Sequence, residues 1–413
     1  METHDVIVVG GDDAADVLAA RLAEGARRKV LLIENGARKR SVNHFARGHR
    51  SAYHQWGEDW SFYDLLPYFK RSENAYGRDL ILRGRGGPLT VAPPAETSPF
   101  MAAVLDAAAE AGEHRAADLG AGWDEGFGTV DSVDGAYPVP AANVVAGALV
   151  HRLRFAKGRA VGVDYSVGSR LFSVSAGQVV VAAGAAESAQ LLMLSGIGPA
   201  GHLGDLGIDV VADLPGVGAN VQAHPVARLV YRTRQRPSGR AIGLVRSRPE
   251  LSGPDLRLIF GDDIAVSVVR PHSRGRLRLA DAVPGTPPLI EANFYRDERD
   301  AAAVVAGLRL GRRIAATAAL SGWLAGEEVP GPANGEEREL SDYARRTVTS
   351  YGQWAGTLAL GSVVDGGLRL RGVGGVHVAD ASVMPSIPSA DLTATGYAIA
   401  ERAADLILGD AGR

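Results

Sequence analysis

The feature that most constrains the fold lies near the start of the chain, in residues 5–34. The apolar run Asp5-VIVV leads into a glycine turn, an amphipathic helix-like stretch and a second apolar run that ends at Glu34. A strand, a helix and a strand in this order make a right-handed crossover, so the two strands are expected to be parallel neighbours. In such units the turn receives a dinucleotide's pyrophosphate, and an acid about 20 residues further on holds the ribose. Gly10, Gly11 and Glu34 are therefore candidate cofactor-binding residues.

The same turn also carries two carboxylates, Asp12 and Asp13, where a doubly negative ligand would sit. An ionised carboxylate about 4 Å from a phosphate costs about 4 kcal/mol at an effective dielectric constant near 20. That cost corresponds to roughly a thousandfold in affinity. Two alternatives stay open: Asp12 turns outward, or both acids cap the helix that follows. The turn is expected to bind a diphosphate poorly.

Further strands and helices are predicted along the rest of the chain. Residues 143–155, 160–167 and 171–185 are expected to form antiparallel hairpins that run into a buried strand, Val179–Ala183, followed by a glycine turn and a helix. Short strands recur between residues 226 and 279, which indicates a separate antiparallel sheet; they lie at 228–233, 255–260, 267–270 and 275–280. A helix is expected over 299–319. The chain returns to a strand at 375–380 and a helix at 394–408.

Composition excludes several classes of function. The chain has no cysteine, which removes disulfides, thiolate nucleophiles and Cys-ligated metals, and no metal site is predicted. The net charge of -3 gives no reason to expect nucleic acid as a partner. The chain opens with no basic and apolar leader, and its first apolar run is too short to span a bilayer. We therefore expect a cytoplasmic protein without membrane insertion, whose oligomeric state the sequence leaves open.

Several motifs occur in an order that resembles a known family. They are Arg47-GH, Trp60-SFYDLLPYFKRSE, Gly87-PLTV, Ala183-GAAESAQLLMLSGIGP, Leu214-PGVGANVQAHP, Arg270-PHSRGRLRL and Val376-HVADASVMPSIPS. Together they resemble the glucose-methanol-choline (GMC) oxidoreductases, flavoproteins that oxidise alcohols with FAD. The resemblance runs nearly end to end and implies the GMC fold.

The resemblance and the chain length together predict two domains, because 413 residues exceed the size at which one core usually stops growing. An α/β, Rossmann-like, FAD-type dinucleotide-binding domain is expected from 1–90, 140–225 and 365–413. A substrate-binding domain with an inserted antiparallel sheet is expected from 91–139 and 226–364.

The chain departs from the family pattern where the family's chemistry takes place. The family's GxGxxG turn has Asp12 at its second glycine, and a long stretch of flavin contacts before Arg47-GH is missing. The resemblance places Gln353 where the family has its catalytic histidine, and Thr393 where it has a paired His or Asn. Neither Gln nor Thr titrates near neutral pH, so neither can accept the substrate's proton. His44 is the best replacement base by residue type, and Asp380 is kept from the family's Asp-Ala-Ser turn.

The leading hypothesis from these departures is a non-redox enzyme on a repurposed GMC scaffold, without a cofactor. It would cyclise or isomerise an apolar biosynthetic intermediate, as in bacterial secondary metabolism, in a pocket near the former flavin site. The catalytic candidates are Gln353, Trp354, Asp391, Thr393 and His44. The cofactor-binding residues, then vestigial, are Gly10, Gly11, Asp12, Glu34 and Asp380. One alternative is an FAD-dependent alcohol oxidoreductase; a second is a non-catalytic pseudoenzyme that binds a ligand.

Overall fold

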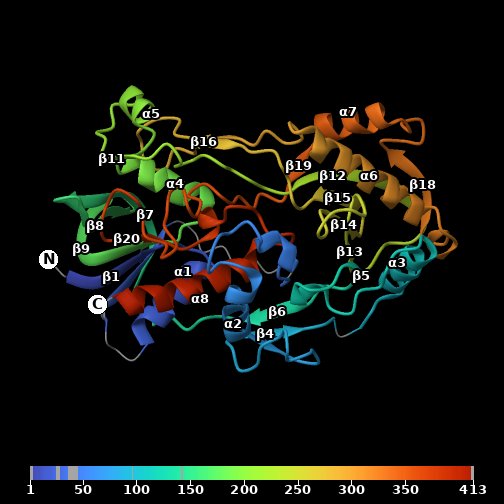
Figure 1. Ribbon diagram of the computed structural model, residues 1–413, viewed down its shortest axis with the longest axis horizontal. Coiled ribbons are helices and arrows are strands. Elements are labelled where there is room, and N and C mark those ends of the chain that lie inside the picture. The colour runs from blue at the N-terminus through green and yellow to red at the C-terminus, as the bar shows by residue number, and fades with distance from the viewer. Residues whose placement is uncertain (1–2, 25–27, 36–44, 95, 141–142, 411–413) are drawn as a thin grey trace.

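Two large sheets organise the structure, one toward each end of the molecule (Figure 1). The computed structural model describes residues 3–24, 28–35, 45–94, 96–140 and 143–410. One apolar core surrounds the first sheet, and a second core lies between the other sheet and the helices that cover it. The expected fold class, a Rossmann-like α/β domain combined with an antiparallel sheet, is confirmed.

The first sheet combines parallel and antiparallel pairing. Its strands are β1 (Thr3–Val9), β2 (Val30–Asn35), β7 (Val144–Ala156), β8 (Arg159–Val167), β9 (Arg170–Val181) and β20 (Val376–Val378). β1 pairs in parallel with β2 and β9, and β20 pairs in parallel with β9. β7, β8 and β9 form an antiparallel meander, and β7 also pairs with β2. The strands β1, β2, β7, β8 and β9 are therefore linked in a closed ring of pairings. The parallel neighbours and the hairpins both follow the sequence expectation.

Continuous burial explains why the central strands of this sheet read as unbroken apolar runs. Val6–Val9 in β1 and Val179–Val181 in β9 have no exposed surface, as is typical of strands covered on both faces. Helix α1 (Asp13–Ala23) packs on β1 and β2, and α4 (Ala185–Leu194) packs on β7. Helix α8 (Leu392–Asp410) packs on α1 and on α2 (Phe62–Ser72), which begins with a capping box.

The second sheet is antiparallel throughout. Its strands, in spatial order, are β18 (Leu324–Val329), β12 (Pro225–Thr233), β15 (Ile264–Val268), β14 (Leu256–Phe260), β13 (Ala241–Val245) and β5 (Gly126–Gly128), with β19 (Thr349–Ser350) beside β12. Helix α6 (Glu298–Ala315) lies against β12, β14 and β15, flanked by α3 (Pro99–Glu110) and α7 (Glu337–Thr347). A Cβ on Gly307 would lie 2.5 Å from Val266 Cγ1, so the missing side chain allows α6 to approach the sheet.

Two details of this sheet differ from the sequence expectation. The strand expected at 275–280 is β16 (Arg276–Arg278), and it pairs with β17 (Leu289–Glu291) instead of joining the sheet. β13 was not expected, because its five residues, all buried, show no alternation of apolar and polar side chains and contain a glycine.

The remaining elements are short. They are β3 (Glu73–Ala75), β4 (Leu89–Ala92), β6 (Ser132–Gly135), β10 (Ile197–Gly198), α5 (Ala200–Asp205), β11 (Ala212–Asp213), and the 3-10 turns η2 (Arg50–Tyr53), η3 (Leu119–Ala121), η5 (Ala318–Leu320) and η6 (Ala381–Val383). The proposed domain boundaries stay a prediction. Among the described residues, every helix is too short or too polar to cross a bilayer.

Candidate active site

Asp12 occupies the start of α1 in the glycine turn. Its Oδ1 accepts hydrogen bonds from the backbone N–H groups of Ala14 at 3.1 Å and Ala15 at 3.3 Å, so the side chain caps the helix. Burial of the carboxyl, together with the nearby charge of Asp380, raises the pKa of Asp12 to about 8. The carboxyl is therefore mostly protonated at pH 7, and it occupies the N–H groups that a phosphate would use.

Gly10 is required by the packing of the strands around it. A Cβ at this position would lie 1.9 Å from the carbonyl oxygen of Ala182, at the end of β9. The N–H of Gly10 donates to Ile33 O at 3.0 Å, which fixes the turn next to the end of β2. Gly11 is partly buried in the same turn, and Glu34, the next residue of β2, is buried. The turn and Glu34 thus lie at neighbouring strand ends, as predicted for a dinucleotide site.

Asp380 joins the ends of β20 and β9. Its Oδ2 accepts hydrogen bonds from Gly184 N at 3.0 Å and Ser188 Oγ at 2.6 Å, and its Oδ1 accepts one from Ser382 N at 2.7 Å. Burial raises the pKa of this carboxyl. Asp12 Oδ2 lies 3.9 Å from where a Cβ on Gly184 would be, so Asp380, Gly184 and Asp12 surround one corner of the site.

Gln353 lies at the start of α8, where Thr393 is the second residue. Gln353 Oε1 accepts a hydrogen bond from Leu392 N at 3.3 Å, and Thr393 is the second residue of the helix, with its side chain partly buried. The ring of Trp354, the residue after Gln353, stacks on Phe294 with 6.3 Å between centroids. The structure therefore brings together the two positions at which the family's catalytic pair was expected.

Asp391, one residue before α8, forms a buried ion pair. Its Oδ1 lies 2.8 Å from Arg257 Nη1, and the Arg257 guanidinium also lies over the ring of Tyr351, 4.9 Å from its centroid. Sequence reasoning missed Arg257, because an arginine in the strand pattern LRLIF suggests a solvated face. Since the carboxylate of Asp391 is held by this cation, Asp391 is not suited to accept a proton from a substrate.

The buried histidines of the described residues near this loop are held neutral. His224 Nε2 lies 2.9 Å from Pro388 O, and burial lowers the pKa of the ring to about 3. His49 contacts Ser51 Oγ through Nδ1 at 2.8 Å, and burial lowers its pKa to about 4. Both rings thus have structural hydrogen bonds. His44 lies outside the described residues.

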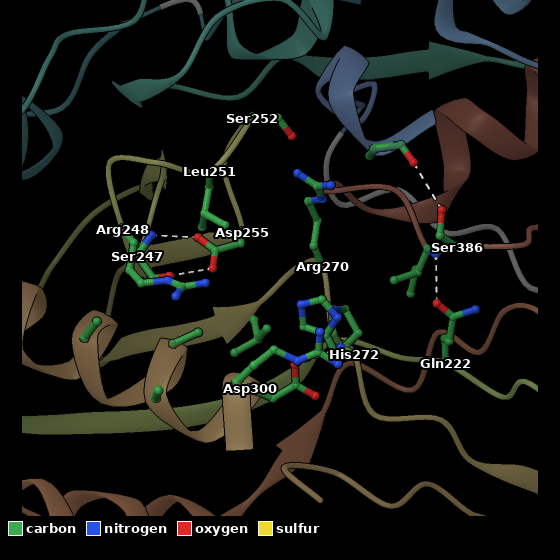
Figure 2. Close-up of a pocket in the computed structure, with 18 of the residues that line it drawn as sticks. Gln222, Ser247, Arg248, Leu251, Ser252, Asp255, Arg270, His272, Asp300 and Ser386 are labelled. Carbon is green, nitrogen blue, oxygen red and sulfur yellow. Dashed lines mark hydrogen bonds between the residues drawn. The ribbon is translucent and has the colours of Figure 1, made fainter. Parts of the chain in front are cut away.

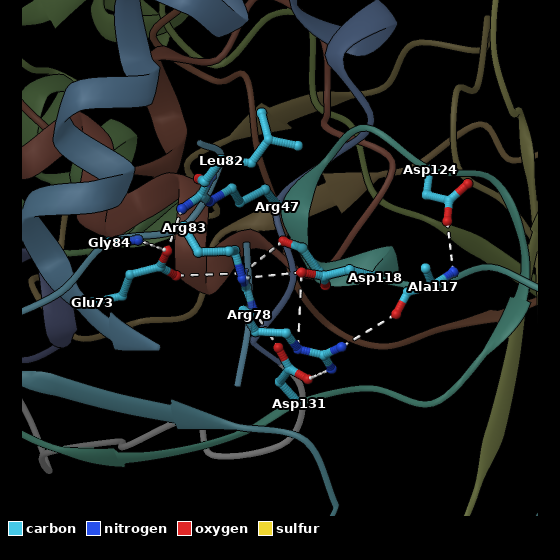
Figure 3. A network of polar contacts seen from close by, with 11 residues as sticks. Arg47, Glu73, Arg78, Leu82, Arg83, Gly84, Ala117, Asp118, Asp124 and Asp131 are labelled. Carbon is cyan, nitrogen blue, oxygen red and sulfur yellow. Dashed lines mark hydrogen bonds and ion pairs between the residues drawn. The ribbon is translucent and has the colours of Figure 1, made fainter. Parts of the chain in front are cut away.

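A buried ionic network supports the loop that contains Arg47 (Figure 3). Glu73 binds Arg47 and, at 3.3 Å, Arg83; Arg83 in turn binds Asp131, which also binds Arg78. Glu73 further accepts a hydrogen bond from Gly84 N at 2.7 Å. Arg47, Glu73 and Arg83 have at most 1% exposed surface. Each charged group in this cluster has an oppositely charged partner, which indicates a structural role.

A cavity of about 400 Å³ lies between the second sheet, the N-terminal end of α6 and the loop of Ser386 and Ile387 (Figure 2). Gln222 forms part of its wall, and its backbone pairs with Ala355, two residues after Gln353. One residue of the cavity wall is therefore hydrogen-bonded to the peptide segment that carries Gln353. Sequence reasoning did not predict this cavity.

Comparisons with known proteins identify relatives over nearly the whole chain. Two family models, both described as GMC oxidoreductase, match residues 41–226 and 271–400. An oxygen-dependent choline dehydrogenase from Pseudomonas aeruginosa (strain LESB58) is 30% identical over 533 aligned positions, covering 99% of this chain and 95% of that protein. Because this chain has only 413 residues, the relative contains segments that are missing here.

Solved structures share the fold. A pyridoxine 4-oxidase from Mesorbium loti superposes with a TM-score of 0.90 and 26% identity, covering 97% of this chain and 98% of that one. An FAD-dependent oxidoreductase from Chaetomium thermophilum has a TM-score of 0.92 and 23% identity, covering 99% and 100%; that likeness shows the fold alone.

These comparisons correct two expectations from the sequence. A cyclase or isomerase without redox chemistry is contradicted, because the relatives are dehydrogenases and oxidases. The absence of a cofactor is also contradicted, because the matched family of oxidoreductases points to FAD. The physical reason lies in Asp12: the predicted repulsion assumed an ionised carboxylate, whereas its raised pKa leaves the group mostly neutral at pH 7.

The recognition of the family from the sequence motifs is confirmed by the same findings. The two family models together cover most of the chain, and the choline dehydrogenase is matched almost from end to end. The chain belongs to the GMC oxidoreductase family.

Proposed function

We propose that this chain is an FAD-dependent oxidoreductase that oxidises a small substrate bearing a hydroxyl group. Family membership over nearly the whole chain is the observation that carries the proposal. Two of the relatives are named for the oxidation of choline and pyridoxine, both of which carry such a group.

The described residues fit a dinucleotide when Asp12 is protonated and its side chain turns away from the N–H groups of Ala14 and Ala15. Glu34 is buried at the end of β2, where a carboxylate accepts hydrogen bonds from a ribose. Gly184 adopts φ +89°, a backbone conformation that glycine tolerates, and Asp380 fixes its N–H. Asp12 is the described acid at the phosphate position. As a neutral carboxyl it does not repel a diphosphate, and its proton can be donated in a hydrogen bond to one.

The residues near Gln353 orient a substrate and do not take its proton. When bound, the flavin would accept the hydride, and the hydroxyl proton would leave to solvent, because none of the described residues beside Gln353 is suited to take it. Gln353 uses its Oε1 for Leu392 N, so its amide NH₂ remains suited to donate a hydrogen bond to a substrate oxygen. The hydroxyl of Thr393 can donate or accept from the adjacent position. Because neither group titrates near neutral pH, both act by positioning the substrate.

The direct test is the absorbance spectrum of the purified chain, before and after incubation with FAD at about pH 6, where Asp12 is protonated. The proposal expects flavin bands at roughly 350–450 nm that bleach when choline, pyridoxine or a benzylic alcohol is added without oxygen. A chain that binds no FAD under these conditions would overturn the proposal.

A pair of variants tests the positioning role. Gln353→Ala is expected to lower kcat/KM by about tenfold or more, the effect of losing one hydrogen bond to the reacting group, with unchanged flavin content. Gln235→Ala is the matched control, because this exposed glutamine bonds only Gly322 O in the second sheet's outer loop. Equal kinetics for the two variants would remove Gln353 from the site.

A further inference from the structure

The cavity of about 400 Å³ is lined by both acidic and basic side chains, and these differ in whether they have close hydrogen-bond or ion-pair partners. Its acids already have partners. Asp255 accepts from Ser247 N and Ser247 Oγ, both at 2.6 Å. Asp300 accepts from His272 N and Ser273 N, both at 2.7 Å. Glu298 pairs with Arg345 at 2.8 Å, so the carboxylates of these three residues are directed to other groups.

The arginine at the centre of the cavity lacks a comparable partner. Figure 2 shows the side chain of Arg270 between the wall formed by Asp255 and the wall formed by Ser386. Among the residues that the structure describes, its one hydrogen bond is a long contact of 3.5 Å from Nη1 to Ser51 Oγ. Asp255 attracts Arg270 only from beyond ion-pair distance, and partial burial lowers the pKa of the guanidinium.

A second arginine adds positive charge to the same wall. Arg274 donates to two backbone carbonyl oxygens, Pro271 O at 2.7 Å and Ser273 O at 3.1 Å. Within the described part of the chain no carboxylate forms an ion pair with it. Burial lowers the pKa of this guanidinium too. The cavity thus presents two partly dehydrated cations on which Asp255 and Asp300 act only from beyond ion-pair distance, and dehydrated charges are normally paired directly.

The guanidinium group of Arg270 indicates which chemical group of a ligand would pair with it. Its planar fork of N–H donors matches the two oxygens of a carboxylate or of a phosphate. The volume lies at the lower end of the range for small-molecule sites, roughly 300–1,000 Å³. We propose that this cavity binds a small molecule with an oxyanion group, whose carboxylate or phosphate pairs with Arg270. The site goes beyond the proposed oxidation and does not depend on bound flavin.

Binding measured by isothermal titration calorimetry on the purified full chain tests this proposal. The probes are succinate, inorganic phosphate and, as the uncharged counterpart of succinate, succinamide. At least one anion is expected to bind with a Kd below about 10 mM, and succinamide is not. Tighter binding of succinate assigns the site to carboxylates, and tighter binding of phosphate assigns it to phosphates.

Three variants separate this cavity from other anion sites. Arg270→Gln is expected to weaken the anion by about tenfold or more, because it removes a charged hydrogen-bond donor. Arg270→Lys keeps the charge without the fork and should give an intermediate affinity. Arg276→Gln, an exposed residue paired with Glu291 outside the cavity, should leave the affinity unchanged.

Two results would overturn the proposal. One is that neither anion binds with a Kd below about 10 mM. The other is that Arg270→Gln, with a normal circular dichroism spectrum, binds the anions as the parent chain does, which would place them at another site such as the turn of Asp12. Flavin content is measured separately, so a failure here does not bear on the proposed oxidation.

Discussion

The network around Glu73 and the cavity around Arg270 differ in whether their charged side chains form ion pairs. In the network, the carboxylate of Glu73 contacts both Arg47 and Arg83, and all three side chains are buried. In the cavity, Arg270 is partly buried and no described carboxylate lies within ion-pair distance. Buried ions that stabilise a fold are paired within it, whereas an unpaired one is a candidate for a ligand. Charge pairing therefore distinguishes scaffold from site in this molecule.

The largest expected effect comes from breaking the network. Glu73→Gln leaves Arg47 and Arg83 buried without their shared carboxylate, which should lower the free energy of unfolding by about 3–5 kcal/mol. Urea unfolding measures the change. Glu125→Gln, which breaks the exposed pair with Arg246, is the control and should cost no more than about 1 kcal/mol. Similar losses for the two variants would contradict the comparison.

A substitution at Asp391 tests whether the ion pair beside the proposed substrate position contributes to the stability of the fold. Asp391→Asn keeps one hydrogen bond to Arg257 but removes the charge, and should lower the free energy of unfolding by about 2–3 kcal/mol. The measurement is again urea unfolding, combined with turnover at a temperature where the variant is folded. Lost turnover with unchanged stability would instead make Asp391 a catalytic residue.

Asp12 extends the comparison to an acid that has no cation as partner among the described residues. Its neighbours are the acids Asp13 and Asp380 and the N–H groups of Ala14 and Ala15, and its pKa is raised to about 8. A raised pKa means that the protonated form is favoured in the fold, so deprotonation above that pH brings a negative charge to the diphosphate position. FAD affinity should fall about tenfold for each pH unit above 8.

Flavin fluorescence titrations at several pH values check this expectation. Asp12→Gly removes the titrating group and should bind FAD with little dependence on pH. Asp13→Asn, which changes the neighbouring acid and keeps Asp12, should retain the dependence with a slightly lower midpoint. A flat profile for the parent chain would show that Asp12 does not control binding of the cofactor.

The smallest effect is expected for the cavity cation. Arg270→Gln removes a charge that no described acid pairs within ion-pair distance, so the free energy of unfolding should change by less than about 1 kcal/mol, or rise. Thermal unfolding without added anions measures it. A loss as large as that of Glu73→Gln would mean that Arg270 is part of the scaffold.

Much of the fold was predictable because it depends on local patterns. The parallel pair β1 and β2, the meander that ends in β9 and the helix α8 all follow from apolar periodicity and glycine turns. β13 was missed because its burial on both faces removes alternation, and β16 was placed in the wrong sheet because a strand's sequence does not specify its partner.

The site was less predictable because its chemistry depends on long-range contacts. The turn of Gly10 forms between β1 and α1 as expected, and Gln353 bonds Leu392 N, next to Thr393, but the assignment of these residues to the site stays a prediction. The function was misjudged because a sequence shows that Asp12 is acidic but not that burial raises its pKa. Arg257 and Arg270 were missed because their partners, or the lack of them, lie far away in the sequence.

Gln222 connects the cavity to the segment that carries Gln353. Its side chain bonds Pro385 O at 3.1 Å and Ile387 N at 3.1 Å in the cavity wall, while its backbone exchanges hydrogen bonds with Ala355. Gln222 is thus the residue through which the cavity and the segment of Gln353 can be coupled. For any such coupling, thermodynamic linkage requires reciprocity: the factor by which an anion in the cavity changes the affinity for a substrate equals the factor by which that substrate changes the affinity for the anion.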